Sequence, residues 1–225
     1  MHIEPGLVSP DKIWLSYVTG AAAGAYALKL AADSIRARGA LSLVGRTAAA
    51  TALVFCFFEV LPHVPVGVSE VHLILGSTLF LILGAAPAAL GLALGLLLQG
   101  LYFAPFDLPQ YGMNVTTLLV PLFGLSMLAG RVIAPGTPYV ALRYRQALAL
   151  STAYQAGIVA WVAFWAFYGH GFTAENTAAI TTFGGAYMLV IIVEPLVDLA
   201  VLAAAKALKG LAGHPFLERR LFEAA

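Results

Sequence analysis

Long apolar stretches, interrupted by short polar or charged segments, dominate this chain. Mostly apolar runs of about 20 residues are long enough to cross a bilayer as helices. Their positions predict seven spans, which cover residues 13–33, 46–62, 70–85, 87–104, 112–133, 142–168 and 177–208. The pattern therefore predicts an all-α integral membrane protein, a bundle of about seven transmembrane helices.

Only Ala85-Ala86-Pro87 separates the third predicted span from the fourth. Proline has no backbone N–H to donate and restricts the residue before it, so it favours the end of a helix. Two arrangements fit this spacing. Either a tight turn joins two short helices, or residues 70–104 form one kinked span and the bundle has six. We favour the tight turn.

Composition supports the membrane assignment. Of the 225 residues, 61% are hydrophobic and only 10% are charged, a balance typical of membrane proteins. We expect a single transmembrane domain over 1–225, with an N-terminal segment (1–12), a helical bundle (13–208) and a cytoplasmic tail (209–225). The chain has no nucleotide-binding loop, so it cannot hydrolyse ATP by itself. The lone Cys56 excludes an internal disulfide.

The positive charges predict the orientation of the bundle. If the chain starts outside and crosses seven times, only Lys12 among the twelve Lys and Arg residues faces outward. The other eleven fall in cytoplasmic segments: Lys29, Arg36, Arg38, Arg46, Arg131, Arg143, Arg145, Lys206, Lys209, Arg219 and Arg220. This asymmetry follows the positive-inside rule and predicts an N-terminus outside and a C-terminus in the cytoplasm. No signal peptide is evident, so we expect Met1 to be retained.

The first two residues form a compact nitrogen chelator. The α-amino group of Met1, the backbone nitrogen of His2 and the His2 imidazole can close two fused rings around one metal ion. One corner of the square plane then stays open, an arrangement that suits Ni(II) or Cu(II). The alternative is that His2 is simply the second residue of a frayed tail.

The predicted topology gathers four of the five histidines at the outer end of the bundle. His2, His63, His72 and His170 lie there, whereas His214 is cytoplasmic. His72 opens the third predicted span, where a folded-in N-terminus can reach it, so its neutral imidazole can supply the fourth nitrogen. Alternatively, His72 is an amphipathic ring at the membrane interface. His63 and His170 lie in loops.

Four short segments, in order, resemble the CbiM/NikM family, the substrate-capture components of cobalt and nickel energy-coupling-factor (ECF) transporters. These are MHIEPGLVSP (residues 1–10), HLILG (72–76), LLLQGLYF (96–103) and GMN (112–114). The last corresponds to the family's Gly-Ala-Asn. The agreement in order and spacing covers residues 1 to about 130, and the remainder agrees only in hydropathy.

The resemblance implies a metal-binding role for particular positions. Met1 would bind through its amino group, His2 through its backbone and side chain, and His72 through its imidazole. Asn114 and Gln99 would hold the N-terminal segment in place by hydrogen bonds, as outer groups do at metal sites. For these two polar residues, ordinary interhelical hydrogen bonding is the alternative.

The same resemblance implies a function and partners. The chain would capture Ni²⁺ or Co²⁺ as transported substrate in a bacterial or archaeal inner membrane. It would work with a scaffold permease (the T component), ATP-binding subunits and a small accessory membrane protein, and not with nucleic acid. Small residues along the first span offer either a docking stripe for the scaffold or ordinary close packing. They are Ser16, Gly20, Ala23, Gly24, Ala27 and Ala31.

Other functions fit the residues less well. An intramembrane hydrolase built on Ser126 would lack both a Gly-x-Ser-Gly and a His-Glu-x-x-His motif. A membrane-embedded metal sensor would use the same outer site without transport. Glu194 and Asp198 form an acidic i, i+4 pair inside the last span, where carboxylates are costly and often functional. They can pair with basic groups, cap a polar network or carry protons, and the sequence does not choose among these.

Overall fold

The computed structural model describes residues 2–134 and 137–207, and this part of the chain contains seven α-helices. They are α1 (Trp14–Arg38), α2 (Ala40–Glu59), α3 (Gly76–Leu83), α4 (Ala85–Tyr102), α5 (Tyr111–Val132), α6 (Tyr144–His170) and α7 (Ala174–Ala207). Five of them are long and apolar enough to cross a membrane: α2, α4, α5 with the preceding 3-10 helix η1 (Pro105–Gln110), α6 and α7. The protein is therefore an all-α membrane protein, as predicted.

Helix α1 begins where its span was predicted but continues five residues further, to Arg38. Its later turns carry Lys29, Asp33, Arg36 and Arg38, which explains why α1 is not among the five most apolar helices. Asp33 pairs with both Lys29 and Arg36 on the surface of the helix.

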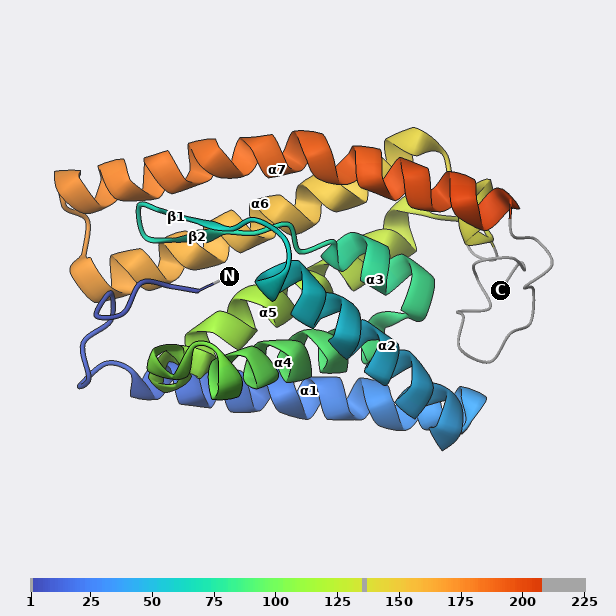
Figure 1. Cartoon of the computed structure of the whole chain (residues 1–225), viewed down its shortest axis with the longest axis horizontal. Coiled ribbons are helices and arrows are strands. Elements are labelled where there is room, and N and C mark those ends of the chain that lie inside the picture. The colour runs from blue at the N-terminus through green and yellow to red at the C-terminus, as the bar shows by residue number, and fades with distance from the viewer. Residues whose placement is uncertain (1, 135–136, 208–225) are drawn as a thin grey trace.

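The third predicted span is only partly helical, so its expected bounds of 70–85 are corrected. Residues Ser69–Val71 form strand β2, which pairs antiparallel with β1 (Val64–Val66), and helix α3 begins only at Gly76. Figure 1 shows that the hairpin reaches into the bundle from one end and that α3 continues toward the other end. Hairpin and α3 together thus replace one continuous helix.

A tight turn joins α3 to α4, as predicted. Gly84 is the single residue between them and has φ 93°, a left-handed conformation that glycine adopts without a steric penalty. Pro87 lies in the first turn of α4, where its missing N–H costs no helical hydrogen bond. The alternative of one kinked helix over 70–104 is therefore wrong.

The N-terminal segment folds back into the bundle beside the hairpin (Figure 1). Ile3 forms an antiparallel bridge with Ser69. The N–H of Glu70 donates to the carbonyl of His2, and that of Glu4 donates to the carbonyl of Val68. The segment therefore acts as a short third strand on β2, which fixes the depth of His2 in the bundle.

Most of the described basic residues lie at one end of the molecule. Arg36 and Arg38 end α1, Arg131 ends α5, and Arg143 and Arg145 begin α6. These helix termini share one end of the bundle (Figure 1), and the hairpin and the N-terminal segment share the other. Lys209, Arg219, Arg220 and His214 lie outside the described residues, as does the predicted tail.

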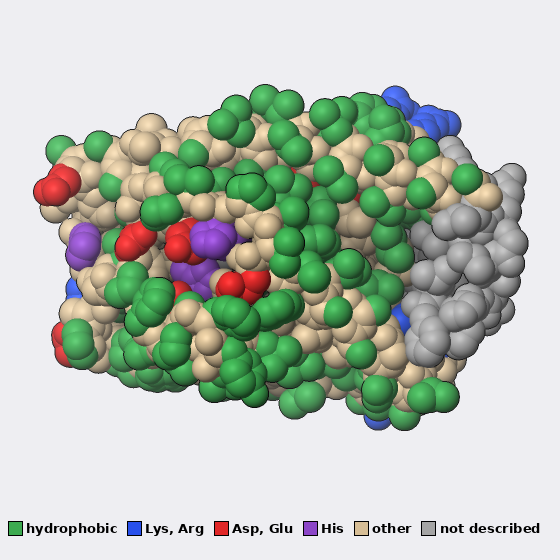
Figure 2. Space-filling view, in the orientation of Figure 1, with side chains coloured by type: hydrophobic (Ala, Val, Ile, Leu, Met, Phe, Trp, Pro, Cys, Tyr) green, Lys and Arg blue, Asp and Glu red, His purple; other side chains and the backbone are tan. Residues whose placement is uncertain are grey.

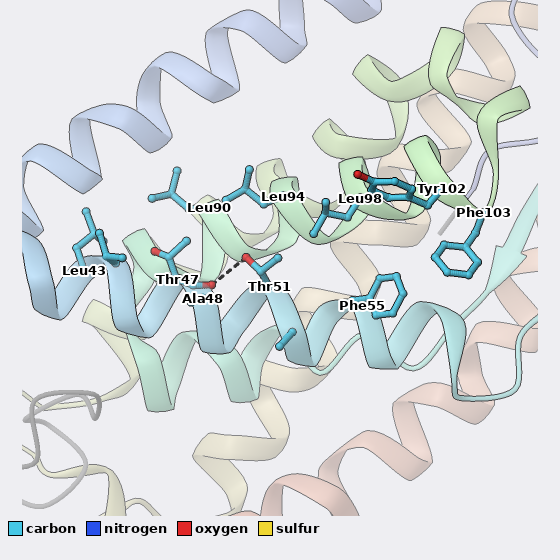
Figure 3. A pocket seen from close by; sticks show the side chains of 12 residues that line it. Leu43, Thr47, Ala48, Thr51, Phe55, Leu90, Leu94, Leu98, Tyr102 and Phe103 are labelled. Carbon is cyan, nitrogen blue, oxygen red and sulfur yellow. Dashed lines mark hydrogen bonds between the residues drawn. The ribbon is translucent and has the colours of Figure 1, made fainter.

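Close helix approach holds α2 against α4. A Cβ on Gly91 would lie 2.3 Å from the Cβ of Ala50, and one on Gly95 would lie 2.6 Å from Val54 Cγ1. Beside this contact an apolar groove of about 760 Å³ opens on the outer face of the two helices (Figure 3). Its lining includes Leu43, Phe55, Leu94 and Leu98 but no His, Cys, Asp or Glu, so the groove offers no ligand that a divalent metal would prefer.

Candidate metal centre

His2 is a buried side chain with a polar neighbour beside each ring nitrogen. Its Nε2 lies 2.7 Å from the Oε1 of Gln99 on α4, and its Nδ1 lies 2.7 Å from the Oδ2 of Asp107 on η1. Only 5% of His2 is exposed. His2 is therefore part of the folded core in this structure and not a frayed tail.

Hydrogen bonds from the backbone also fix the residues around His2. The N–H of Ile3 donates to Asn114 Oδ1 at 2.9 Å, and the hydroxyl of Ser69 donates to the His2 carbonyl at 2.9 Å. Gln99 and Asn114, the two polar residues singled out in the sequence, thus both contact the N-terminal segment. Asn114 and Ser69 are themselves almost fully buried.

His72 lies next to His2, in the irregular segment between β2 and α3 and outside the five spanning helices. The centroids of the two rings are 5.7 Å apart. Only 1% of His72 is exposed. Burial lowers the pKa of the His72 imidazole below its ordinary value, so the ring is held in the neutral form that binds metal ions.

Glu70 completes a cluster with the two histidines. One candidate ligand atom from each of His2, Glu70 and His72 lies within 4.8 Å of the other two. Glu70 Oε2 lies 2.9 Å from His72 Nε2, whereas nothing among the described residues hydrogen-bonds to the buried Nδ1 of His72. Figure 2 shows histidine and acidic side chains gathered on this face of the molecule.

Two acidic residues beside the histidines, Glu70 and Asp107, were not predicted from the sequence. Glu70 lies in β2 and His72 directly follows that strand, whereas the segment was interpreted as a helix, on which i and i+2 residues point in different directions. Asp107 is a single acidic residue in an otherwise apolar run (residues 104–109). An isolated carboxylate in such a run is the sequence feature that could have identified it as a candidate site residue.

The remaining histidines are less closely involved. His63 stacks on His72 with ring centroids 4.9 Å apart and an interplanar angle of 13°. Its side chain is exposed, and so is that of His170 at the end of α6. Met1 and His214 lie outside the described residues, so the structure gives no position for the predicted amino-group ligand.

A small void lies against His2. Its volume is about 10 Å³, and its lining includes Asp107, Asn114 and Tyr111. About this much space holds a single water molecule. Its lining includes neither His72 nor Glu70, so this void is not the space between the two histidines.

The small residues of α1 pack inside the bundle. Ser16, Ala23, Ala27 and Ala31 are buried, and a Cβ on Gly20 would lie 3.4 Å from the Cα of Gly112 on α5. A Cβ on Gly24 would meet nothing within 4 Å among the described residues. Docking of a partner along this stripe stays a prediction.

The chain matches known metal-uptake proteins. A family model for CbiM, "Cobalt uptake substrate-specific transmembrane region", matches residues 2–210. A solved structure described as "Crystal Structure of an Truncated Transition metal Transporter" has a TM-score of 0.71 at 21% identity, covering 92% of this chain and 99% of that one. A second, "Crystal Structure of an transition metal transporter", has a TM-score of 0.70 at 21% identity, covering 93% and 94%. No curated protein matches in sequence.

Proposed function

Because the chain belongs to the CbiM family of cobalt-uptake membrane proteins, we propose that it captures Ni²⁺ or Co²⁺ as the substrate-binding component of an ECF-type transporter. The family is one of transport proteins, so the chain is a transport protein and not an enzyme. The proposal rests on one observation: the rings of His2 and His72 lie close together, both buried, beside the folded-back N-terminal segment.

Four nitrogens form the proposed coordination plane: the Met1 amino group, the His2 backbone nitrogen, the His2 imidazole and the His72 imidazole. A chelate ring that includes the His2 backbone nitrogen closes most readily through Nδ1, the ring nitrogen nearer the backbone. Nε2 can then donate its hydrogen to Gln99 Oε1, which lies 2.7 Å away. This hydrogen bond leaves the Nδ1 lone pair for the metal ion, which would displace the Asp107 carboxylate oxygen that lies 2.7 Å from Nδ1 in this structure.

His72 has the same arrangement. Its Nε2 can donate to Glu70 Oε2 at 2.9 Å, which leaves the unpartnered Nδ1 to bind the ion. A carboxylate behind a ligating histidine fixes its orientation and increases its basicity. We therefore assign Glu70 the role of orienting His72, and Asn114 and Gln99 the role of holding the N-terminal segment.

The charge distribution supports cation capture at this end of the bundle. Six acidic residues lie at the end that contains the N-terminal segment, with Lys12 as the only Lys or Arg among the described residues there. They are Glu4, Asp11, Glu59, Glu70, Asp107 and Glu175. Burial raises the pKa of the Glu4 carboxyl, and the carboxylates of Glu70 and Asp107 raise it further. Such a concentration of negative charge attracts divalent cations and increases their association rate.

Turnover requires partners in this proposal. The chain has no nucleotide-binding loop, so ATP-binding subunits and a scaffold permease would drive release of the ion to the cytoplasm. The substrate-binding component can bind its ion tightly without them. Metal binding by the isolated protein is therefore the property to measure.

The test is to extend the N-terminus. One glycine added before Met1 removes the proposed amino-group ligand and leaves every described side chain unchanged. We expect calorimetry to show that tight binding of Ni²⁺ and Co²⁺ is lost while the thermal unfolding midpoint of the metal-free protein is unchanged. Binding by the native protein should weaken as pH falls, because the ligand nitrogens must lose their protons. Equal affinity of the native and extended proteins would refute the chelate.

A further inference from the structure

A phenylalanine packs against both histidines of the candidate metal centre. Phe58 lies in the last turn of α2 and is fully buried. Its ring meets that of His72 nearly perpendicularly, with centroids 5.1 Å apart and an interplanar angle of 79°. It meets the ring of His2 in a similar way, at 6.3 Å and 67°. Both pairs have the edge-to-face geometry in which aromatic rings are in direct contact.

This position places Phe58 beside any ion that both histidines bind. The bond from a metal ion to a histidine nitrogen is about 2 Å long, and the centroids of the two histidine rings are 5.7 Å apart. An ion bound to both rings must therefore lie near the midpoint between them. The three centroid distances place the Phe58 ring closer to that midpoint than to the centroid of either histidine.

Phe58 offers the ion no ligand atom and stands in the way of water. Four nitrogens in one plane leave further ligand positions only above and below that plane. The apolar residues around a metal site control the access of water to such positions, and the Phe58 ring occupies the approach from α2. The polar neighbours of His2, by contrast, come from α4 and η1, where Gln99 and Asp107 lie.

Exclusion of an axial ligand affects Ni²⁺ and Co²⁺ differently. Proteins select between divalent transition metals largely by the geometry of the site, and a planar set of nitrogens suits Ni²⁺. Co²⁺ usually adds one or two further ligands to such a plane. An apolar wall that excludes water from one side of the ion therefore disfavours Co²⁺ more than Ni²⁺.

We propose that Phe58 is a specificity-determining residue of the metal centre, which excludes an axial water ligand from the bound ion and so favours Ni²⁺ over Co²⁺. This inference rests on the proposed function, because it assumes that His2 and His72 bind the ion. It gives α2 a role in the choice of ion although Phe58 does not itself bind it.

The test varies the size of this side chain in the full chain with its native terminus. Alanine and valine are smaller than phenylalanine by more than the volume of one water molecule, about 30 Å³, whereas leucine is not. We expect F58A and F58V to lower the ratio of Ni²⁺ affinity to Co²⁺ affinity, measured by calorimetry, about tenfold. Bound Ni²⁺ should change from diamagnetic, as a planar four-coordinate ion is, to paramagnetic, because an axial water is added. F58L should keep the ratio within threefold and the ion diamagnetic.

Two other phenylalanines provide the controls. Phe55 lies one turn earlier in α2, where its ring contacts that of Phe103 beside the outer groove (Figure 3). Phe80 is a buried residue of α3 and lines a void with Gly84, at the turn to α4. F55A and F80A should leave the affinity ratio and the magnetic state of Ni²⁺ unchanged, although F80A should lower the unfolding midpoint. If F58A does not fold, F58V provides the same test with a smaller loss of packing.

The outcomes distinguish this inference from the proposed function. If H72A binds Ni²⁺ as tightly as the original protein, the proposed function is wrong. If H72A loses affinity but F58A and F58V change neither the affinity ratio nor the magnetic state, Phe58 only fills space and the inference is overturned. It is also overturned if Ni²⁺ in the original protein is already paramagnetic, because the ion then has an axial ligand despite Phe58.

Discussion

At the scale of single residues, the sequence singled out the two histidines of the candidate site but not the carboxylates beside them. His2, His72, Gln99 and Asn114 were singled out, and the structure brings all four together around the N-terminal segment. Asp107 was missed. The donor atoms of a metal-chelating terminus are adjacent in the chain, so they can be recognised in the sequence. Whether a carboxylate from another loop reaches the site depends on how the helices pack, which the sequence alone does not reveal.

The histidines should contribute unequally to metal affinity. H72A and H2A should each lose most of the affinity, since either change removes a ligand nitrogen from the plane. H63A and H170A should change it less than tenfold, or less than about 1.4 kcal/mol, and H214A should have no effect. The rings of His63 and His72 are nearly parallel, so their in-plane lone pairs do not converge on one ion. Calorimetry on each variant checks the order, and a greater loss for H63A than for H72A would contradict it.

Asp107 should strengthen binding through its charge. Its carboxylate lies 2.7 Å from His2 Nδ1, so an ion on that nitrogen gains a negative neighbour in a buried site. We expect D107N to bind Ni²⁺ about tenfold more weakly, or by about 1.4 kcal/mol. D33N is the matched control, because it removes the same charge at the opposite end of the bundle. An equal loss of affinity in the two variants would point to an effect of net charge alone.

At the scale of elements, α4 to α7 were predicted to within three residues, whereas α2 begins at Ala40, six residues before its predicted start, and the hairpin was not predicted. Hydropathy identifies apolar stretches but does not separate a strand from a helix over a short run. The stretch from Ser69 to Leu83 is apolar enough for a helix, yet its first part pairs with residues 2–4 and 64–66. That pairing depends on the folded-back terminus, which local sequence does not reveal.

The start of α3 should not tolerate a side chain at Gly76. A Cβ there would lie 2.3 Å from the ring of Tyr154, a fully buried residue on α6. Overpacking of this kind typically costs about 1–3 kcal/mol. We expect G76A to lower the thermal unfolding midpoint and to weaken Ni²⁺ binding, because a displaced start of α3 would also shift the adjoining segment that contains His72.

Gly124 of α5 provides the control for that substitution. A Cβ at this position would meet nothing within 4 Å among the residues that the structure describes, and alanine is a better helix former than glycine. G124A should therefore unfold at or above the temperature of the original protein and bind Ni²⁺ with the same affinity. A similar fall in both variants would mean that the contact with Tyr154 does not decide the effect.

At the scale of the whole molecule, the division of charge between the two ends is the feature that decides orientation. The described basic residues other than Lys12 lie at the end opposite the candidate metal centre, with Arg46 buried there against the carbonyl of Leu83. Positive charges favour the cytoplasmic side, so the metal centre should face outward. The N-terminal segment lies at the metal-centre end of the bundle and α7 ends at the opposite end (Figure 1). The odd number of crossings and the charge bias therefore predict the same orientation in the membrane.

Cysteine labelling in intact cells tests this orientation. In a C56S background, F172C places a thiol in the exposed turn between α6 and α7, at the metal-centre end, where Phe172 is 86% exposed. A141C places one in the exposed connection between α5 and α6, at the opposite end. A membrane-impermeant maleimide should label F172C in intact cells and A141C only after permeabilisation. The reverse pattern would place the metal centre on the cytoplasmic side, where it could not capture an ion from outside.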